Sequence, residues 1–159
     1  NYVGFHLALP PYGLSQTQIG LVFCAYVFGI AASPAAGALA DRLGRAPVLL
    51  GGVALMAAGV LLSSAAPLAA VVAGIVLLTF GFFVAHAVAS GWVGVLARAS
   101  KGHASALYLL AYYLGSSVVG SSGGWFWEHG RWPGMVAFSL ALLGVALGLG
   151  LRLRQRTAI

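Results

Sequence analysis

The sequence has little charge and almost no acid. Only 6% of its 159 residues are Asp, Glu, Lys or Arg, and just two of these, Asp41 and Glu128, are acidic. Soluble domains carry about 25% charged residues. Because 61% of the residues are hydrophobic, the composition excludes a water-soluble surface and predicts an integral membrane protein.

Cysteine is also scarce, since Cys24 is the only one and lies within an apolar run. An intrachain disulfide and a metal site built on paired cysteines are excluded, and we expect neither a metal nor a cofactor. The net charge is +6, and basic chains often bind nucleic acid. Here the basic residues lie in short clusters at the ends of apolar runs. We interpret them as orientation signals and expect a lipid bilayer, not nucleic acid, as the partner.

The apolar runs are long enough to form membrane-spanning helices, each of which needs about 20 residues. They predict five complete spans, at residues 16–39, 47–65, 67–97, 104–126 and 132–151, followed by a basic tail at 152–159. Residues 1–9 are apolar but too short to span. We interpret them as the end of a truncated span, so that the chain is part of a longer protein. A bend is expected at Pro34, inside the first complete span.

The predicted spans place the basic residues very unequally on the two membrane surfaces. Arg131 lies alone on one side, and the other side receives Arg42, Arg45, Arg98, Lys101, Arg152, Arg154 and Arg156. Cytoplasmic loops are enriched in Lys and Arg. We therefore predict that the larger group and the C-terminus are cytoplasmic. Tryptophans near Arg131 are typical of the opposite headgroup region.

A short charged stretch, Gly37 to Pro47 with the sequence GALADRLGRAP, separates the first two complete spans. We expect it to form a loop at the membrane surface. Its spacing resembles the signature G-x-L-A-D-R-x-G-R-[KR] of the major facilitator superfamily. Seven positions fit the signature: Gly37, Leu39, Ala40, Asp41, Arg42, Gly44 and Arg45. Ala46 departs from it, because the family usually has a second basic residue there.

Other stretches resemble the second half of a bacterial efflux permease of this superfamily, namely Ser33–Gly37, Gly81–His86, Lys101–Tyr108 and Tyr112–Ser117. The resemblance implies that residues 1–159 are the C-terminal bundle, from the end of span 7 to span 12, of an inner-membrane secondary transporter. Such transporters pair two six-helix bundles, each built from inverted three-helix repeats, around a midplane site. The implied partners are an N-terminal six-helix half, a small organic substrate and protons. Because the first half also carries the signature, a first-half assignment stays open.

The resemblance further implies a conformational switch at Gly37, Asp41, Arg42, Gly44 and Arg45. In the family the acid helps to hold the outward-facing state by contact with the other half, and the arginines tune that contact. A surface carboxylate can also accept hydrogen bonds from the N-terminus of a nearby helix, where the backbone dipole favours negative charge. The two glycines would allow close helix approach and a tight turn.

Polar side chains inside a membrane are costly and tend to face a bundle interior or a cavity. In the third complete span, Thr79, Phe83, His86 and Ser90 recur at intervals of three and four residues and so share one helical face. His86 is the only ionisable residue deep in a complete span. Its imidazole could bind substrate or exchange a proton. The alternative is a neutral histidine hydrogen-bonded to a neighbouring helix.

The fourth complete span carries a second stripe, of hydroxyls and rings, that begins at Ser105. Tyrosine rings can hold flat or cationic organic molecules, although ordinary helix packing would produce a similar stripe. We predict a substrate cavity lined by polar and aromatic side chains from several spans: His86, Ser90, Tyr108, Tyr112, Ser116, Tyr26 and His6.

Small residues recur at intervals of four in the last two spans, as Gly120 with Gly124 and Gly144 with Gly148. Such pairs allow helices to pack closely in lipid, so we predict helix contacts there. They also leave open a membrane scaffold that does not transport. An intramembrane enzyme built on His86 is disfavoured, because no acid, second histidine or cysteine is placed to assist, and we predict no catalytic residue.

No complete span contains Asp or Glu. If transport is driven by protons, the proton must therefore be carried by His86 or by an acid in the other half. We favour the other half.

Overall fold

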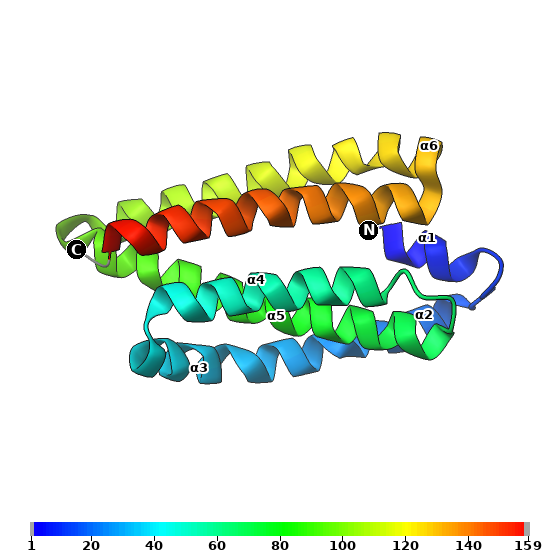
Figure 1. Cartoon of the computed structure of the whole chain (residues 1–159), viewed down its shortest axis with the longest axis horizontal. Helices are drawn as coiled ribbons and strands as arrows, with labels where there is room; N and C mark the ends of the chain where they lie inside the picture. Colours follow the sequence, from blue (N-terminus) through cyan, green and yellow to red (C-terminus); the bar gives the residue numbers. More distant parts are fainter. Residues whose placement is uncertain (1, 158–159) are drawn as a thin grey trace.

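The chain folds into a bundle of long helices. A computed structural model describes residues 2–157, with side chains through residue 155, and every regular element in that part of the chain is helical. The helices are α1 (Tyr2–Ala8), α2 (Gln16–Val22), the 3-10 turn η1 (Phe23–Ala25), α3 (Tyr26–Leu43), α4 (Arg45–Leu62), α5 (Leu68–Leu96), the 3-10 turn η2 (Arg98–Ser100) and α6 (Lys101–Thr157). Figure 1 shows the long helices lying side by side along one axis.

Four helical stretches are long and apolar enough to cross a membrane: Gln16–Leu43, Arg45–Leu62, Leu68–Leu96 and Arg98–Gln155. The last consists of two legs, because Arg131 has non-helical dihedral angles (φ 48°, ψ −141°) and the chain turns back there. We call residues 101–130 the outgoing leg and residues 132–157 the return leg; Figure 1 draws them in yellow-green and orange-red. The predicted all-α membrane fold is confirmed, and the helix ends differ from the predicted span limits by a few residues.

The charged stretch between the first two spans is not a loop. α3 continues through Gly37 to Leu43, α4 begins at Arg45, and only Gly44 (φ 91°, ψ 151°) lies between them. Glycine adopts positive φ at little cost because it has no Cβ, so a single residue is enough to reverse the chain. The prediction of a loop over residues 37–47 is therefore wrong. Asp41 lies in the last turn of one helix, and Arg45 opens the next.

The first span has its irregular backbone near its start. Within Gln16–Leu43 the α-helical pattern changes at η1, whereas Pro34 lies inside α3, which continues without interruption on both sides of it. The bend predicted at Pro34 is thus not marked by a break in the helix. The change at η1 places Tyr26 at the first position of α3.

α4 and α5 make a close contact through two pairs of glycines, Gly52 with Gly81 and Gly59 with Gly74. A Cβ added at Gly59 would lie 2.5 Å from Leu78 N and 2.6 Å from Gly74 O, and one added at Gly81 would lie 2.6 Å from Gly52 O. Side chains would not fit at these distances, so the two backbones are in direct contact. Small residues are used in this way where helices pack closely in lipid.

The glycines for which helix contacts were predicted, in the last two spans, do not make backbone contacts of this kind. A Cβ added at Gly144 or Gly148 would have no atom of the described chain within 4 Å, so the predicted packing is not found at either residue within this bundle. Gly124 faces the hydroxyl of Tyr2, and Gly120 O accepts a hydrogen bond from that hydroxyl at 3.0 Å. Gly120 and Gly124 therefore both contact the side chain of Tyr2 in α1, and no helix backbone of the described chain lies beside Gly124.

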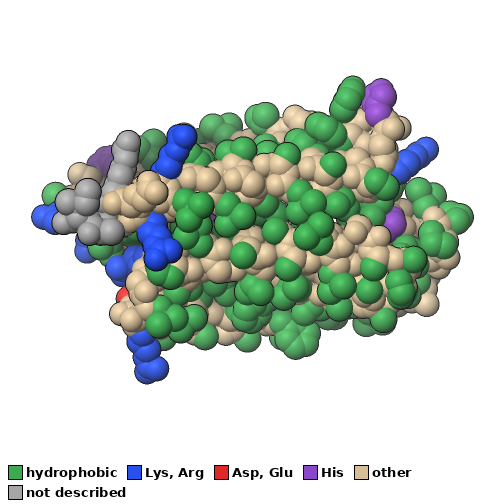
Figure 2. All heavy atoms as spheres, in the orientation of Figure 1, with side chains coloured by type: hydrophobic (Ala, Val, Ile, Leu, Met, Phe, Trp, Pro, Cys, Tyr) green, Lys and Arg blue, Asp and Glu red, His purple; other side chains and the backbone are tan. Residues whose placement is uncertain are grey.

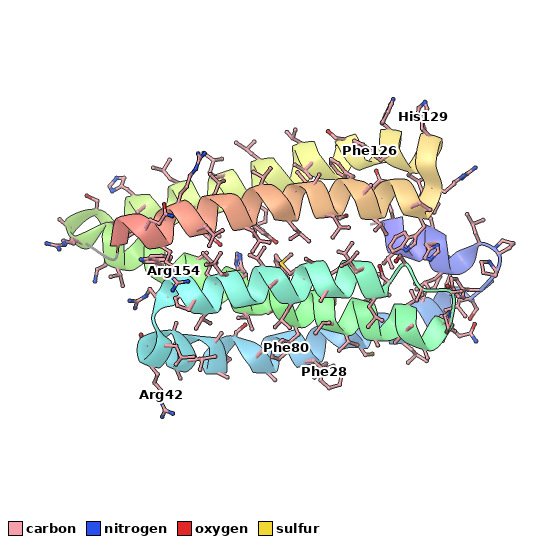
Figure 3. All side chains as sticks on the ribbon, viewed as in Figure 1. Phe28, Arg42, Phe80, Phe126, His129 and Arg154 are labelled. Atoms are coloured by element: carbon pink, nitrogen blue, oxygen red, sulfur yellow. The ribbon has the colours of Figure 1, made fainter. Side chains whose placement is uncertain are left out.

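The basic side chains gather at one end of the bundle, which we call the basic end. It is formed by the α3–α4 junction, the α5–α6 junction and the end of the return leg, which carry Arg42, Arg45, Arg98, Lys101, Arg152 and Arg154. Figure 3 shows Arg42 and Arg154 at this end and His129 at the other. The opposite end holds Arg131 and three tryptophans, Trp125, Trp127 and Trp132, and we call it the tryptophan end. Between the ends, Figure 2 shows a surface covered mainly by hydrophobic side chains.

Candidate substrate cavity

His86 lies on α5 and makes a hydrogen bond to the outgoing leg of α6. Its Nδ1 atom is 3.0 Å from the hydroxyl oxygen of Tyr108. Among the described residues, the other ring nitrogen, Nε2, has no hydrogen-bond partner. A neutral imidazole has one donor and one acceptor nitrogen, so the Tyr108 contact uses one of them and leaves the other for a ligand.

Aromatic rings surround His86. Phe82 stacks on it at a centroid distance of 5.5 Å and an interplanar angle of 17°, and Tyr112 lies at 4.9 Å and 51°. The Tyr108 ring lies at 5.6 Å. Because three rings hold the imidazole, its orientation is fixed by packing as well as by the hydrogen bond to Tyr108.

The rings of Phe82 and Tyr112 border a cavity of about 590 Å³, which we call the aromatic cavity. It is lined by side chains from α3, α4, α5 and the outgoing leg: Tyr26, Met56, Leu78, Thr79, Phe82, Phe83, His86, Leu109, Tyr112 and Tyr113. Sites for small organic ligands have volumes of about 300–1,000 Å³, with mostly apolar walls and a few polar groups. The aromatic cavity has both properties, and its rings can stack on a flat ligand or attract a cation.

The ring of Phe83 on α5 packs directly against Gly29 of α3. A Cβ added at Gly29 would clash with the Phe83 ring, and Gly29 itself is buried. The same ring meets Tyr26 edge to face at 5.9 Å and Phe82 at 5.5 Å. The missing side chain at Gly29 therefore sets how far Phe83 can withdraw from the cavity.

The structure brings together some of the residues predicted for the substrate cavity. Tyr26, His86 and Tyr112 line it, and Tyr108 is bonded to His86. Ser90 and Ser116 are exposed and do not line it, because each lies one helical turn further along its helix.

His6 lies elsewhere, which corrects its predicted place in the substrate cavity. It is in α1, and its ring stacks on Trp132 at 4.2 Å and 3°, with Tyr12 edge-on at 5.3 Å. Trp132 Nε1 donates a hydrogen bond to Ser63 O at 2.8 Å. The spacing of residues in the sequence could not predict the contact between His6 and Trp132. That contact depends on how α1 packs against the return leg at the tryptophan end.

Sequence reasoning missed Phe82, Tyr113 and Met56. Phe82 and Tyr113 each adjoin a predicted residue, and their rings are large enough to reach the cavity from the edge of the predicted helical face. A stripe about 100° wide on α5 would have included Phe82, whereas Tyr113 lies outside a stripe of that width on the outgoing leg. Met56 comes from α4 and carries no polar group that could have distinguished it.

The signature residues form one weak ion pair. Arg45 Nη2 is 3.5 Å from Asp41 Oδ1, four residues away across Gly44, and the two side chains are 33% and 72% exposed. Ion pairs this exposed are worth about 0–1 kcal/mol. No atom of the described chain lies within 4 Å of a Cβ placed at Gly37, so the close helix approach predicted for that glycine is not found here.

Comparison with known proteins decides the family. The Major Facilitator Superfamily profile matches residues 4–158. The chain belongs to the Major Facilitator Superfamily. Together with the helices described above, this makes it part of a multi-pass membrane protein.

Similar proteins occur in several bacteria. The chain is 45% identical over 156 residues to Inner membrane transport protein YnfM of Escherichia coli, covering 98% of this chain and 37% of that protein. It is 42% identical over 149 residues to Uncharacterized MFS-type transporter YybF of Bacillus subtilis, covering 94% and 37%. An uncharacterized transporter of Buchnera aphidicola from Schizaphis graminum is 37% identical over 155 residues, covering 98% and 38%. No solved structure matches the chain significantly.

The chain thus spans a little over a third of the length of these relatives.

Proposed function

We propose that this bundle is the C-terminal half of a secondary transporter that exports small organic molecules across the bacterial inner membrane in exchange for protons. Alternating access would come from rocking of this bundle against a second six-helix bundle. Support comes from the superfamily match and from relatives named as transport proteins. The observation that carries the proposal is the aromatic cavity, which has the size and lining of a small-molecule site.

The basic end faces the cytoplasm in this proposal, together with the C-terminus. Among the described residues, Arg131 is the only Lys or Arg at the tryptophan end. An excess of Lys and Arg marks cytoplasmic segments, and tryptophans mark headgroup regions. The aromatic cavity, about midway along α5 and the outgoing leg, then lies near the membrane midplane, where superfamily transporters bind their cargo.

The cargo is a flat organic molecule, either uncharged or carrying a delocalised positive charge. Phe82, Phe83, Tyr112 and Tyr26 offer ring faces and edges for stacking or cation–π attraction. His86 contributes a hydrogen bond through the ring nitrogen that Tyr108 does not use. The described lining contains no carboxylate, so a compact ammonium group would lack a counter-charge there.

The proton is carried outside this bundle. Both acids of the chain, Asp41 and Glu128, lie at helix ends and not in the middle of a span. We assign the proton carrier to an acid of the other half and leave to His86 the binding of cargo. Asp41, which is 72% exposed, serves as a latch that contacts the other half in the outward-facing state.

The test uses the full-length transporter that contains this bundle, reconstituted in proteoliposomes with an imposed pH gradient. The probes are ethidium, which is flat and cationic, and tetraphenylphosphonium, which is bulky and cationic. We expect His86→Ala and Tyr112→Ala to slow movement of ethidium about tenfold, since each removes about 1.4 kcal/mol of ring contact or hydrogen bonding. Leu114→Ala, an exposed position that does not line the cavity, is the matched control.

Normal transport by both cavity variants would overturn the assignment of the cavity. Movement that persists after the pH gradient is collapsed would remove proton coupling. Failure of the wild-type protein to move either probe would overturn the proposed class of cargo.

A further inference from the structure

A groove of about 550 Å³ runs between α3 and α4, and we call it the apolar groove. Its lining comes from these two helices and from two residues of α5, Phe80 and Val84. Apart from Gly51 and Gly52, all the described residues that line it are hydrophobic. The apolar groove therefore has no side chain that could hydrogen-bond to a polar ligand or pair with a charge.

The apolar groove is hollow because small residues lie along it. α3 packs against Val48 of α4 and Val84 of α5 through Ala32 and Ala36, which bring the backbone of α3 close to its neighbours. On the facing helix, a Cβ added at Gly51 would have no atom of the described chain within 4 Å. The bundle thus leaves space along both helices that its own side chains do not fill.

The apolar groove and the aromatic cavity lie on nearly opposite sides of α5. At about 100° per residue, Phe80 and Val84 point roughly 150° away from the mean direction of the α5 residues that line the aromatic cavity. In the proposed transporter the aromatic cavity faces the second bundle, because superfamily sites lie between the two bundles. The apolar groove then faces the lipid.

The length of the apolar groove matches one leaflet of a bilayer. On α3 its lining begins at Ala32 and ends at Leu43, a rise of about 16 Å along the helix. The hydrocarbon core of a bilayer is about 30 Å thick, and each leaflet contributes about half of it. Phe80 lies near the middle of α5, whereas Leu43 ends α3 at the basic end. A phospholipid tail from the leaflet at the basic end can therefore lie along the whole groove.

Two arginines stand where the apolar groove meets the basic end. Arg42 precedes Leu43, and Arg45 lies two residues before Pro47, which also lines the groove. Arg45 is 3.5 Å from Asp41, whereas Arg42 makes no hydrogen bond or ion pair with the described chain. Two arginines against one acid leave an excess of positive charge. Arginine binds phosphate through paired hydrogen bonds, and basic pockets between spans bind anionic lipid headgroups.

We infer that the apolar groove binds an anionic phospholipid of the leaflet at the basic end. One acyl chain lies between α3 and α4, and the phosphate lies at Arg42 and Arg45. A zwitterionic phospholipid has the same tails, but its ammonium group would meet the positive charge of the arginines. The inference goes beyond the proposed function and takes from it only the place of the second bundle.

The test is photocrosslinking with a phosphatidylglycerol that carries a diazirine in one acyl chain. The full-length transporter is placed in phosphatidylcholine vesicles that contain a trace of this probe, and mass spectrometry maps the labelled residues. We expect labelling at Leu39 and Leu55, which line the apolar groove from α3 and from α4. Excess unlabelled phosphatidylglycerol should reduce this labelling at least fivefold, and the same amount of phosphatidylethanolamine should leave it nearly unchanged.

Two substitutions fill the apolar groove from opposite walls. Gly51→Leu fills it from α4 and Ala35→Leu from α3. The matched controls are Gly144→Leu and Ala38→Leu, at exposed positions that do not line the groove. We expect labelling of the groove to fall at least fivefold in both filled variants and to stay unchanged in the controls. The Tm of each variant shows whether it has kept its fold.

The headgroup contact is tested by removing one positive charge at a time. Arg42→Gln removes the arginine next to the apolar groove, and Lys101→Gln removes an exposed charge at the same end but at the α5–α6 junction. We expect Arg42→Gln to weaken competition by phosphatidylglycerol about fivefold, the effect of one basic residue at an anionic lipid. Lys101→Gln should change it less than about twofold, because that charge lies away from the groove.

Each alternative occupant gives a different result. Equal labelling in the filled variants and in their controls overturns the site, because the probe then contacts the bundle without a preferred place. Equal competition by the two unlabelled lipids, or equal effects of Arg42→Gln and Lys101→Gln, overturns the anionic headgroup. Absence of labelling at Leu39 and Leu55 also overturns the inference, as expected if a second copy of the protein covers the groove. None of these measurements requires transport, so a failure of ethidium movement would overturn the proposed cargo and not the lipid site.

Discussion

α5 contacts two of its neighbours, α4 and the outgoing leg of α6, in different ways. Against α4 it presents Gly74 and Gly81, whose backbones touch those of Gly59 and Gly52. Against the outgoing leg it presents Phe82 and His86, which meet tyrosines through rings and one hydrogen bond. Backbone contact fixes the distance between two helices, whereas rings can turn and leave space. The cavity lies on the side of α5 where side chains, not backbones, make the contact.

Substitutions at the glycine contact between α4 and α5 should therefore destabilise the protein more than substitutions on the side of α5 that faces the cavity. We expect Gly59→Val to cause the largest loss of stability, about 3 kcal/mol or more, because added atoms would overlap the α5 backbone. Thermal unfolding of the full-length protein in detergent measures this. Gly51→Val, on the open face of the same helix, should change the Tm little. Equal Tm values for the two variants would show that the glycine contact does not limit helix separation.

The next substitution should make the aromatic cavity narrower, although the residue that is changed does not line it. Gly29→Ala should push the Phe83 ring into the aromatic cavity, because a methyl group at position 29 clashes with that ring. One methyl group in a binding pocket changes discrimination by about tenfold or more. We expect transport of the bulky tetraphenylphosphonium to fall about tenfold relative to that of flat ethidium. Gly20→Ala, in open space on the same span, is the control, and an unchanged ratio of the two probes would contradict the prediction.

A smaller effect is expected from the hydrogen bond to His86. Tyr108→Phe keeps the ring and removes the hydroxyl that lies 3.0 Å from His86 Nδ1. Loss of a hydrogen bond worth about 1 kcal/mol should weaken ethidium binding about fivefold. In a His86→Ala background the same change should have almost no further effect, because its partner is gone. Additive losses in the double variant would mean that Tyr108 acts on the cargo independently of His86.

The smallest effect is expected at the basic end. Arg45→Ala removes the exposed pair with Asp41, and we expect the free energy of unfolding to change by less than about 0.5 kcal/mol. Thermal unfolding at low and high salt tests this, since salt screens exposed pairs. A larger loss that disappears in high salt would show that Asp41 is held locally by Arg45 and is not available as a latch.

Periodicity and composition were sufficient to predict the helices and part of the site. The apolar runs predicted the spans because a helix in lipid must satisfy its own backbone hydrogen bonds. Intervals of three and four residues placed Thr79, Phe83 and His86 on one face of α5, and all three line the aromatic cavity.

Features that depend on two separate segments could not be predicted. The pairing of Gly59 with Gly74 requires knowing how α4 and α5 align, although two glycines seven residues apart on each helix, Gly52 with Gly59 and Gly74 with Gly81, are a signal that the sequence does carry. The stacking of His6 on Trp132 joins the start of the chain to the return leg. The one-residue turn at Gly44 depends on a backbone angle that local propensity does not determine.

The reversal at Arg131 has a mechanical consequence. Only this residue separates the outgoing leg from the return leg, and Phe126 stacks on Phe138 across the turn at 4.2 Å. Because no flexible loop lies between them, we expect the two legs to move together as a rigid helical hairpin. A displacement of the leg that carries Tyr108 and Tyr112 is then expected to move the leg that carries Trp132 and Ser139 with it, because the covalent chain joins them with no loop between.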